Sequence, residues 1–374
     1  MSQSVPGNFY RIPGQSISWV GECPWTRTIA FGSEEGWLST ILADAGPDQG
    51  EFFALNLATA PINGVAFEDE WMAISTPAEV ALYMRGVDLV PAARHAHSFN
   101  GGAFGVVGTG SGGFLAPIGT DGLLLLDPKL DRSEDRLPRI IRFDDRRINY
   151  HKIADVAREI SGRTFACASR RDGLVGLHLT GGRIDRPLIN HRSHREDIVD
   201  VCGLMDPNHP RGVVCIGRNR GIHVFRDVLA DRPPRSIRFE SFEGNAYSIA
   251  SLQGHLFVLT DAALYVLPDI AARLLREEPI DRIVKTCTVV TDASEAFAIG
   301  LDRLLLLEDN GVLEYSAAGL IAGLGDGNAR GDANRFRSAG REHASVIRPS
   351  FQETQSTRLD VVWSQEFHMN EIAC

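Results

Sequence analysis

The chain has 374 residues, of which 44% are hydrophobic, and its formal net charge is −10 at pH 7. This length fits two average domains or one large all-β array, and the apolar content is enough for a large core. No stretch approaches the roughly eighteen uncharged apolar residues of a membrane helix, and residues 1–16 lack the basic and apolar regions of a secretory signal. We therefore expect a soluble, cytoplasmic protein.

The charge is unevenly spread along the chain. Residues 1–128 carry a net charge of −9, residues 129–239 a net charge of +8, and residues 240–374 a net charge of −9. A basic sector between two acidic ones biases which partners approach and in which orientation, but it does not identify them.

Seven short apolar runs recur along the chain, and their starts are 40 to 51 residues apart. Strands bounded by Gly, Asp, Asn and Pro turns at such a period are typical of propeller blades. The pattern predicts an all-β, seven-bladed β-propeller. The runs are Trp37–Leu42, Val80–Met84, Leu123–Asp127, Leu174–Leu179, Ile222–Asp227, Ala263–Asp269 and Arg303–Asp309.

The fifth repeat shows the predicted blade most clearly. After an outer strand near Pro187–Asn190, an inner strand follows His194, and Gly212–Gly217 and Ile222–Asp227 flank a polar turn. This order resembles the WD40 repeat, although Phe225-Arg226-Asp227 stands where that family has its Trp-Asp pair. We identify the chain as similar to divergent WD40-like propellers, a resemblance that implies a rigid protein-binding fold.

Two segments could supply the strand that closes the last blade. Asn8–Ile12 could pair onto blade seven, and Leu313–Ser316 follows that blade directly, so the sequence leaves open which end of the chain closes the ring. These strands would protect the edges that an open seam exposes. The Asp269–Glu278 segment has the apolar period of a short helix.

The predicted domains are a propeller over residues 1–316, a flexible Gly/Ala/Arg-rich segment over 317–356 and a strand-like tail over 357–374. Because the middle segment is expected to be flexible, we expect its arginines to be accessible to a partner or a protease. Its candidate contact or cleavage residues are Arg330, Arg335, Arg337 and Arg341.

Two motifs that suggest chemistry are better explained as structure. Gly105–Gly113 is glycine-rich, but a strand-like run follows it instead of the helix that a phosphate-binding loop requires. His191 and His194 lie in a loop, where a structural role is favoured over metal binding. The six cysteines form no C-x-x-C pair and are expected to be buried free thiols. We therefore expect no metal site and no cofactor.

Basic residues gather in the turns and loops of blades four and five. The WD40 resemblance implies that the turn between the two middle strands and the loop before the inner strand open onto one face. Converging guanidinium groups suit a carboxylate, a phosphate or an acidic peptide. The candidate partner-binding residues are Arg170, Arg171, His194, Arg195, Arg218 and Arg220.

Three functions agree with this reading. The first is a non-catalytic scaffold or regulatory subunit, whose partner has an acidic surface; the arginine-bearing tail suggests control of an effector enzyme or protease in a bacterial stress or defence system. The second is a lactonase-like or hydrolase-like enzyme with a site at the central channel. The candidate residues of that site are Glu35, Asp121 and Asp172. The third is a receptor for a small anion. Nucleic acid binding is not expected, because the chain is acidic.

Overall fold

The computed structural model describes most of the chain up to residue 351. The described residues are 7–10, 15–23, 28–42, 51–84, 90–97, 105–128, 139–142, 148–180, 183–184, 189–190, 196–219, 221–238, 242, 244–278, 293–300, 302–308, 311–322, 345–347 and 350–351. They fall into two compact units, one of Met1–Tyr10 with Ala154–Val346 and the other of Arg11–Ile153 with Ile347–Cys374.

The second unit contains three antiparallel sheets, each following the order of the chain. The first holds β2 (Ile17–Cys23), β3 (Thr28–Ser33), β4 (Trp37–Leu42) and β5 (Glu51–Asn56), with β30 (Ser350–Phe351) parallel to β5. The next holds β6 (Gly64–Glu68), β7 (Trp71–Ser75), β8 (Glu79–Met84) and β9 (Ala93–Ala96). The third holds β10 (Val107–Gly108), β11 (Phe114–Pro117), β12 (Leu123–Leu126) and β13 (Arg139–Ile141).

The first unit contains the other four sheets. One holds β14 (Asn149–Glu159), β15 (Gly162–Arg170), β16 (Leu174–Thr180), β17 (Arg183–Ile184) and β18 (Ile189–Asn190). The first residues of β14, up to Ile153, belong to the second unit. The next holds β19 (Ile198–Gly203), β20 (Val213–Gly217), β21 (Gly221–Phe225) and β22 (Arg235–Ile237). Then come β23 (Ala246–Leu252), β24 (His255–Thr260) and β25 (Leu264–Leu267). The last sheet has the order β26 (Glu295–Ile299), β27 (Arg303–Glu308), β28 (Gly311–Ser316), β1 (Gly7–Tyr10) and β29 (Ser345–Ile347).

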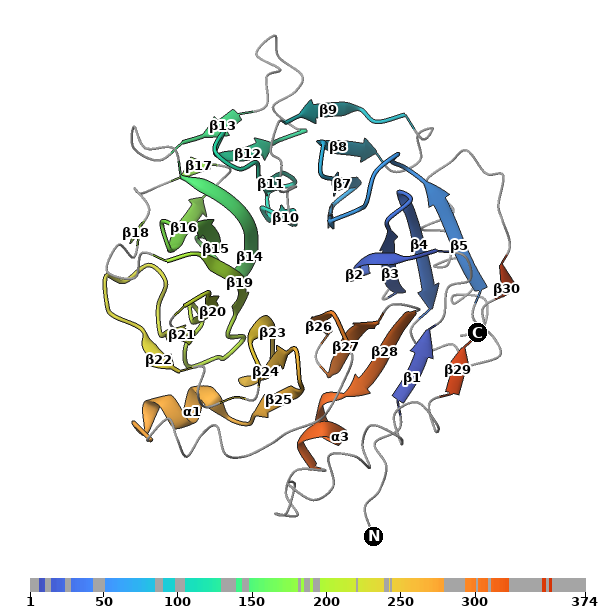
Figure 1. Ribbon diagram of the computed structural model, residues 1–374. Helices are drawn as coiled ribbons and strands as arrows, with labels where there is room; N and C mark the ends of the chain where they lie inside the picture. Colours follow the sequence, from blue (N-terminus) through green and yellow to red (C-terminus); the bar gives the residue numbers. More distant parts are fainter. Residues whose placement is uncertain are drawn as a thin grey trace, which may run out of the picture. The chain divides into compact units, whose positions relative to one another are not determined.

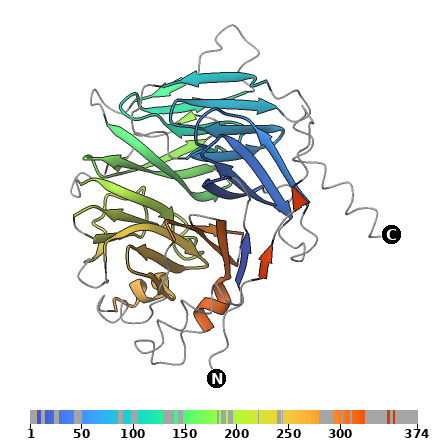
Figure 2. The same ribbon diagram turned by 45° about the vertical axis from the view of Figure 1, so that its right-hand side comes forward.

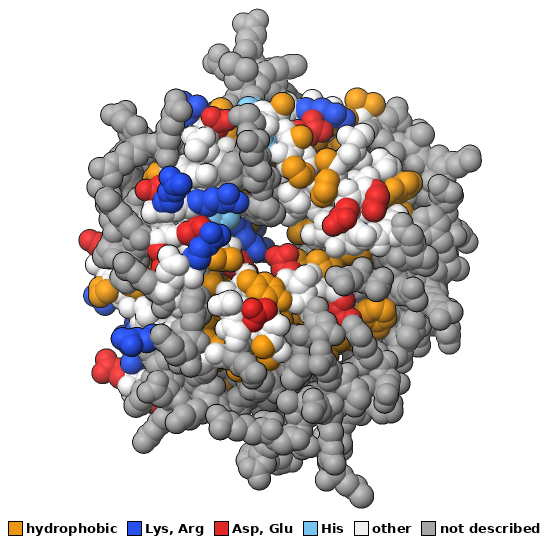
Figure 3. Space-filling model, viewed as in Figure 1, with side chains coloured by type: hydrophobic (Ala, Val, Ile, Leu, Met, Phe, Trp, Pro, Cys, Tyr) orange, Lys and Arg blue, Asp and Glu red, His pale blue; other side chains and the backbone are white. Residues whose placement is uncertain are grey.

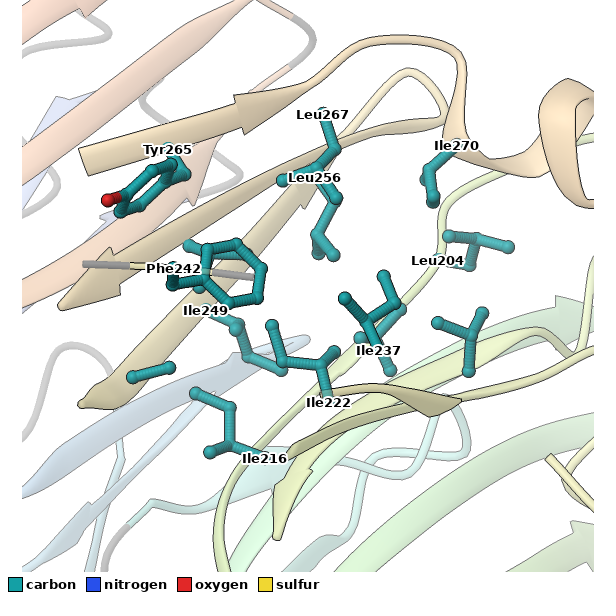
Figure 4. Packing of buried hydrophobic residues seen from close by; sticks show 14 of the residues in the cluster. Leu204, Ile216, Ile222, Ile237, Phe242, Ile249, Leu256, Tyr265, Leu267 and Ile270 are labelled. Atoms are coloured by element: carbon teal, nitrogen blue, oxygen red, sulfur yellow. The ribbon is translucent and has the colours of Figure 1, made fainter. Parts of the chain in front are cut away.

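Each of the seven sheets is one blade (Figure 1), so the prediction of an all-β, seven-bladed β-propeller is confirmed. Within each unit the hydrophobic core lies between consecutive blades. Figure 4 shows one such cluster, in which Ile222 and Ile237 of the fifth blade face Ile249 and Leu256 of the sixth. Phe242 packs edge-on against Tyr265, with ring centroids 5.0 Å apart. The second and third strands of a blade, such as β20 and β21, are therefore buried on both faces, which explains why these strands read as continuous hydrophobic runs.

The N-terminal strand joins the last blade next to β28, so both segments that could close the blade belong to it. β1 pairs antiparallel with β28, and Figures 1 and 2 both show the two strands side by side. The Glu314 carboxylate of β28 accepts hydrogen bonds from Asn8 Nδ2 at 2.9 Å and from the Tyr10 hydroxyl, and Arg303 of β27 lies 3.3 Å away. Burial, and then the nearby Glu314, raise the pKa of Tyr10, so its phenol stays protonated and donates.

Six of the seven predicted runs are the third strands of their blades, but the seventh is not. Arg303–Asp309 corresponds to β27, which is the second strand of its blade. The third strand is β28, which includes the Leu313–Ser316 segment that we expected to follow the blade. Both strands are almost entirely buried, so hydrophobicity alone does not distinguish them.

Among the described residues, two short helices accompany the strands. Helix α1 (Ile270–Leu275) lies within the predicted Asp269–Glu278 helix, which is thereby confirmed. Helix α3 (Ala317–Ala322) follows β28 and occupies the start of the segment 317–356. The candidate tail residues Arg330, Arg335, Arg337 and Arg341, and the tail 357–374, lie outside the described residues.

Candidate functional site in the turns of blades four and five

The turn between β15 and β16 holds two of the candidate arginines. Ser169 accepts a hydrogen bond from the backbone N–H of Asp172 at 3.1 Å and donates its hydroxyl proton to Gly173 O at 2.8 Å. A serine that accepts and donates hydrogen bonds within a turn in this way helps to fix the backbone of the turn. Arg170 and Arg171 are therefore held at an exposed hairpin tip.

Arg171 adopts a backbone conformation that is unusual for its residue type. Its φ is 84°, in the left-handed region that glycine and asparagine prefer. Such a conformation costs about 1–2 kcal/mol for a residue with a Cβ.

The next turn of the same kind, between β20 and β21, carries Arg218. The Arg218 Nε lies 3.2 Å from Asp197 Oδ2, and the Arg218 side chain is 65% exposed. The turn ends at Gly221, whose φ of 112° and close approach to Ile237 O leave no room for a Cβ. The Arg218 guanidinium group is thus open to solvent, although its Nε contacts the Asp197 carboxylate.

The loop before β19 joins the two turns. The Gly173 N–H donates to Glu196 O at 3.1 Å, and the Arg218 N–H donates to Asp197 O at 2.8 Å. Two consecutive loop residues thus bind both turns, so that Arg170, Arg171 and Arg218 lie on the same edge of neighbouring blades. His194, Arg195 and Arg220 lie outside the described residues. We refer to Arg170, Arg171 and Arg218 as the basic turns.

A buried polar network supports this loop. Glu196 Oε1 hydrogen bonds to His223 Nε2 on β21, and the other ring nitrogen of His223 lies 2.8 Å from Ser236 Oγ on β22. The His223 side chain is 1% exposed and that of Glu196 is 3% exposed. Removing one partner of such a buried pair is costly, because the other is left without compensation. Sequence reasoning missed this network, although a histidine inside the apolar run GIHVF is a signal for it.

The basic turns lie in two neighbouring blades of their unit. In the following blade the equivalent turn is acidic, and Asp261 accepts a hydrogen bond from the Asn245 backbone N–H at 2.9 Å. Figure 3 shows Lys and Arg side chains gathered on the face in view, over the region that Figure 1 labels β14 to β16. A partner with a carboxylate would be favoured at the basic turns and disfavoured beside Asp261.

The residues proposed for catalysis occupy turns in different units. Glu35 lies in the β3–β4 turn and Asp121 in the β11–β12 turn of the second unit, whereas Asp172 lies in the β15–β16 turn of the first. In the part of the chain that the structure describes, no group of three or more His, Cys, Asp or Glu residues is placed to hold a metal ion.

The glycine-rich loop has a structural role. The Gly110 N–H donates to the buried Glu68 carboxylate at 2.9 Å, and Thr109 Oγ1 accepts from the Gly113 N–H at 3.1 Å. Strand β11 then begins at Phe114. The loop is therefore a turn within a blade, as predicted, and its backbone binds the Glu68 carboxylate of the same unit.

Two other predicted features can be placed. Cys167, Cys202 and Cys215 are free thiols, and burial raises the pKa of both Cys167 and Cys215. Among the residues described, no helix has the length and apolar character needed to span a bilayer.

Comparison with known proteins identifies the fold. No family model matches the chain, and no curated protein matches it significantly. Among solved structures, the chain is similar to the WD40 β-propeller domain of Doa1, with a TM-score of 0.54 and 10% sequence identity over 84% of this chain and 96% of that one. The predicted resemblance to divergent WD40-like propellers is confirmed: the chain has a WD40-like fold with very little sequence similarity.

Proposed function

We propose that this protein is a non-catalytic interaction scaffold that holds an acidic segment of a partner protein at the basic turns. The propeller fold fits a protein-interaction scaffold. The observation that carries the finer proposal is the pair of backbone hydrogen bonds from Gly173 and Arg218 to consecutive loop residues, which bring two arginine-bearing turns to one edge.

The chemistry of these turns favours a carboxylate-bearing partner. A guanidinium group offers several N–H donors in a fixed plane, and its hydrogen bonds to carboxylates are stronger than those between neutral groups. Arg171 and Arg218 sit on turns that are already fixed, so little ordering entropy opposes binding there. Asp197 contacts Arg218 in the free protein, and a partner carboxylate would compete with it.

Affinity capture from the native host tests the proposal. The full chain is compared with Arg171→Asp/Arg218→Asp and with Arg232→Asp, a matched control that reverses one exposed arginine of the same unit in the β21–β22 loop. We expect one stoichiometric protein that is lost with the double variant and retained with the control. If all three proteins capture it equally, the basic turns are not the site. If none retains a protein, an enzyme or a small-anion receptor becomes the better account.

We further propose that the partner is regulated by this protein, as an effector enzyme or protease would be in a stress or defence system of a bacterial cytoplasm. The support is the arginine-rich composition of the segment 317–356. The test is a full-length variant in which four arginines are replaced by Gln: Arg330, Arg335, Arg337 and Arg341. We expect a change in the activity of the partner, or in the cleavage of the segment 317–356 as followed by mass spectrometry. Unchanged activity together with unchanged cleavage would remove the regulatory part and leave the scaffold.

A further inference from the structure

Two acidic residues, Glu196 and Asp197, follow one another in the loop that joins the basic turns, and their side chains make different contacts. The Glu196 side chain is 3% exposed, and its Oε1 hydrogen bonds to His223 Nε2 in the interior of the blade. The Asp197 side chain is 22% exposed, and its Oδ2 lies 3.2 Å from Arg218 Nε. Asp197 is therefore the acid of this pair that a ligand of the basic turns would meet.

The backbone holds Asp197 opposite Arg218. The Arg218 N–H donates to Asp197 O at 2.8 Å. Their neighbours Ile198 and Gly217 are partners in the ladder of β19 and β20, and Ile198 is buried in a hydrophobic cluster. Because the strand register and this hydrogen bond set the same position, the Asp197 carboxylate is fixed beside Arg218 more firmly than in an ordinary surface ion pair.

The ion pair leaves the Arg218 guanidinium group accessible to a ligand. Asp197 Oδ2 is nearest to Nε, and 65% of the Arg218 side chain is exposed. A ligand oxygen can therefore reach the guanidinium group from solvent. At hydrogen-bonding distance from that group, the oxygen also lies well within the Debye length of about 8–10 Å from the Asp197 carboxylate. Salt then screens the repulsion between the two anions only in part.

This repulsion increases with the charge of the ligand. The Coulomb energy is proportional to the product of the two charges. A carboxylate carries one negative charge, whereas a phosphoserine carries about 1.5 to 2 at pH 7. A fixed Asp197 carboxylate therefore weakens the binding of a phosphate group more than that of a carboxylate at the same place. Specific interfaces commonly combine such a repulsive element with the attractive ones.

We propose that Asp197 determines the ligand specificity of the basic turns, an inference that rests on their proposed function. Asp197 contacts Arg218 in the free protein, lowers the affinity of the turns for every anionic ligand, and selects carboxylates over phosphate groups. The ligand is accordingly a segment with unmodified Asp or Glu side chains, and not a phosphorylated segment.

Two nine-residue peptides with blocked ends, which differ only in carrying two glutamates or two phosphoserines, test the proposal. Their dissociation constants are measured by fluorescence anisotropy with the full-length protein at about 20 mM salt, where screening is weak. Asp197→Asn should raise the affinity for the glutamate peptide by about threefold and for the phosphoserine peptide by about tenfold, since the gain scales with the charge of the ligand.

Asp231→Asn is the matched control, because it removes the same charge from the same unit. Asp231 is exposed and lies in the β21–β22 loop, which follows the end of β21 that is away from the turn carrying Arg218. It should leave both affinities unchanged. Asp197→Asn keeps the backbone oxygen that binds the Arg218 N–H, so this variant should unfold at nearly the same urea concentration as the wild type.

The outcomes separate this inference from the proposed function. If Arg171→Asp/Arg218→Asp binds the glutamate peptide as well as the wild type does, or if neither the wild type nor Asp197→Asn binds either peptide, both proposals fail. If the double variant loses binding but Asp197→Asn gains none, or gains equally for the two peptides, only the role of Asp197 is overturned. A lower affinity of Asp197→Asn would also overturn it, because Asp197 would then position Arg218 for binding.

Discussion

Arg171 illustrates how a single residue can separate stability from binding. Its left-handed backbone is strained, so Arg171→Gly should relieve about 1 kcal/mol of strain, partly offset by the greater freedom of glycine in the unfolded chain. We expect an unchanged or slightly higher urea midpoint together with weaker partner binding. Arg218→Gly is the contrast, because Arg218 has no positive φ and contacts Asp197; it should lower the midpoint. A clear loss of stability in Arg171→Gly would show that its side chain serves the fold.

His97 gives the stability of the second unit a dependence on pH. Burial lowers the pKa of His97, and nearby His95 adds to this, whereas the Thr76 backbone, Asp121 and Glu79 act in the opposite direction. With the lowered pKa, the unfolded chain binds the proton more readily than the folded protein does. Stability is therefore complete above the unfolded pKa of about 6.5 and is lost as the pH falls below it.

Chemical unfolding of the full chain between about pH 7.5 and 5 measures this dependence. The free energy of unfolding should fall less with decreasing pH in His97→Gln than in the wild type. Parallel curves for the two proteins would contradict the assignment to His97.

At the scale of elements, the N-terminal strand depends on one carboxylate. Glu314→Ala would remove the acceptor of Asn8 and Tyr10 and leave Arg303 without its close carboxylate. We expect a loss of about 2–4 kcal/mol in the free energy of unfolding, with faster amide hydrogen exchange in β1. Glu70→Ala, at an exposed turn, should cost almost nothing. Equal effects of the two substitutions would mean that Glu314 does not hold β1.

The blades were predictable because their strands are buried on both faces and are separated by turns with strong sequence signals. The seventh repeat shows the limit, since β27 and β28 are similarly apolar and the pattern alone does not order them. The histidine inside the apolar run GIHVF indicates a buried polar contact, but its partners Glu196 and Ser236 were not predictable, because they lie in other segments at no fixed spacing. The convergence of the basic turns followed from the family resemblance instead of from residue pattern.

At the scale of the whole molecule, charge and fold have separate origins. The repeat period predicts a propeller whatever its surface carries, and the 10% identity to a WD40 domain shows how little of the sequence the fold constrains. The net charge of +8 in residues 129–239 comes from strand residues such as Lys152 and Arg163 as well as from turn residues such as Arg171. Function must therefore be proposed from individual surface residues, here the basic turns.

The most direct test of the central claim is the dissociation constant of the purified partner complex, measured for three proteins at one salt concentration. Arg171→Asp/Arg218→Asp should weaken binding by about a hundredfold or more, because two charge-assisted contacts are replaced by repulsion. Arg232→Asp should change it by no more than about threefold. A dissociation constant that is the same for the wild type and the double variant would contradict the assignment of the basic turns as the partner site.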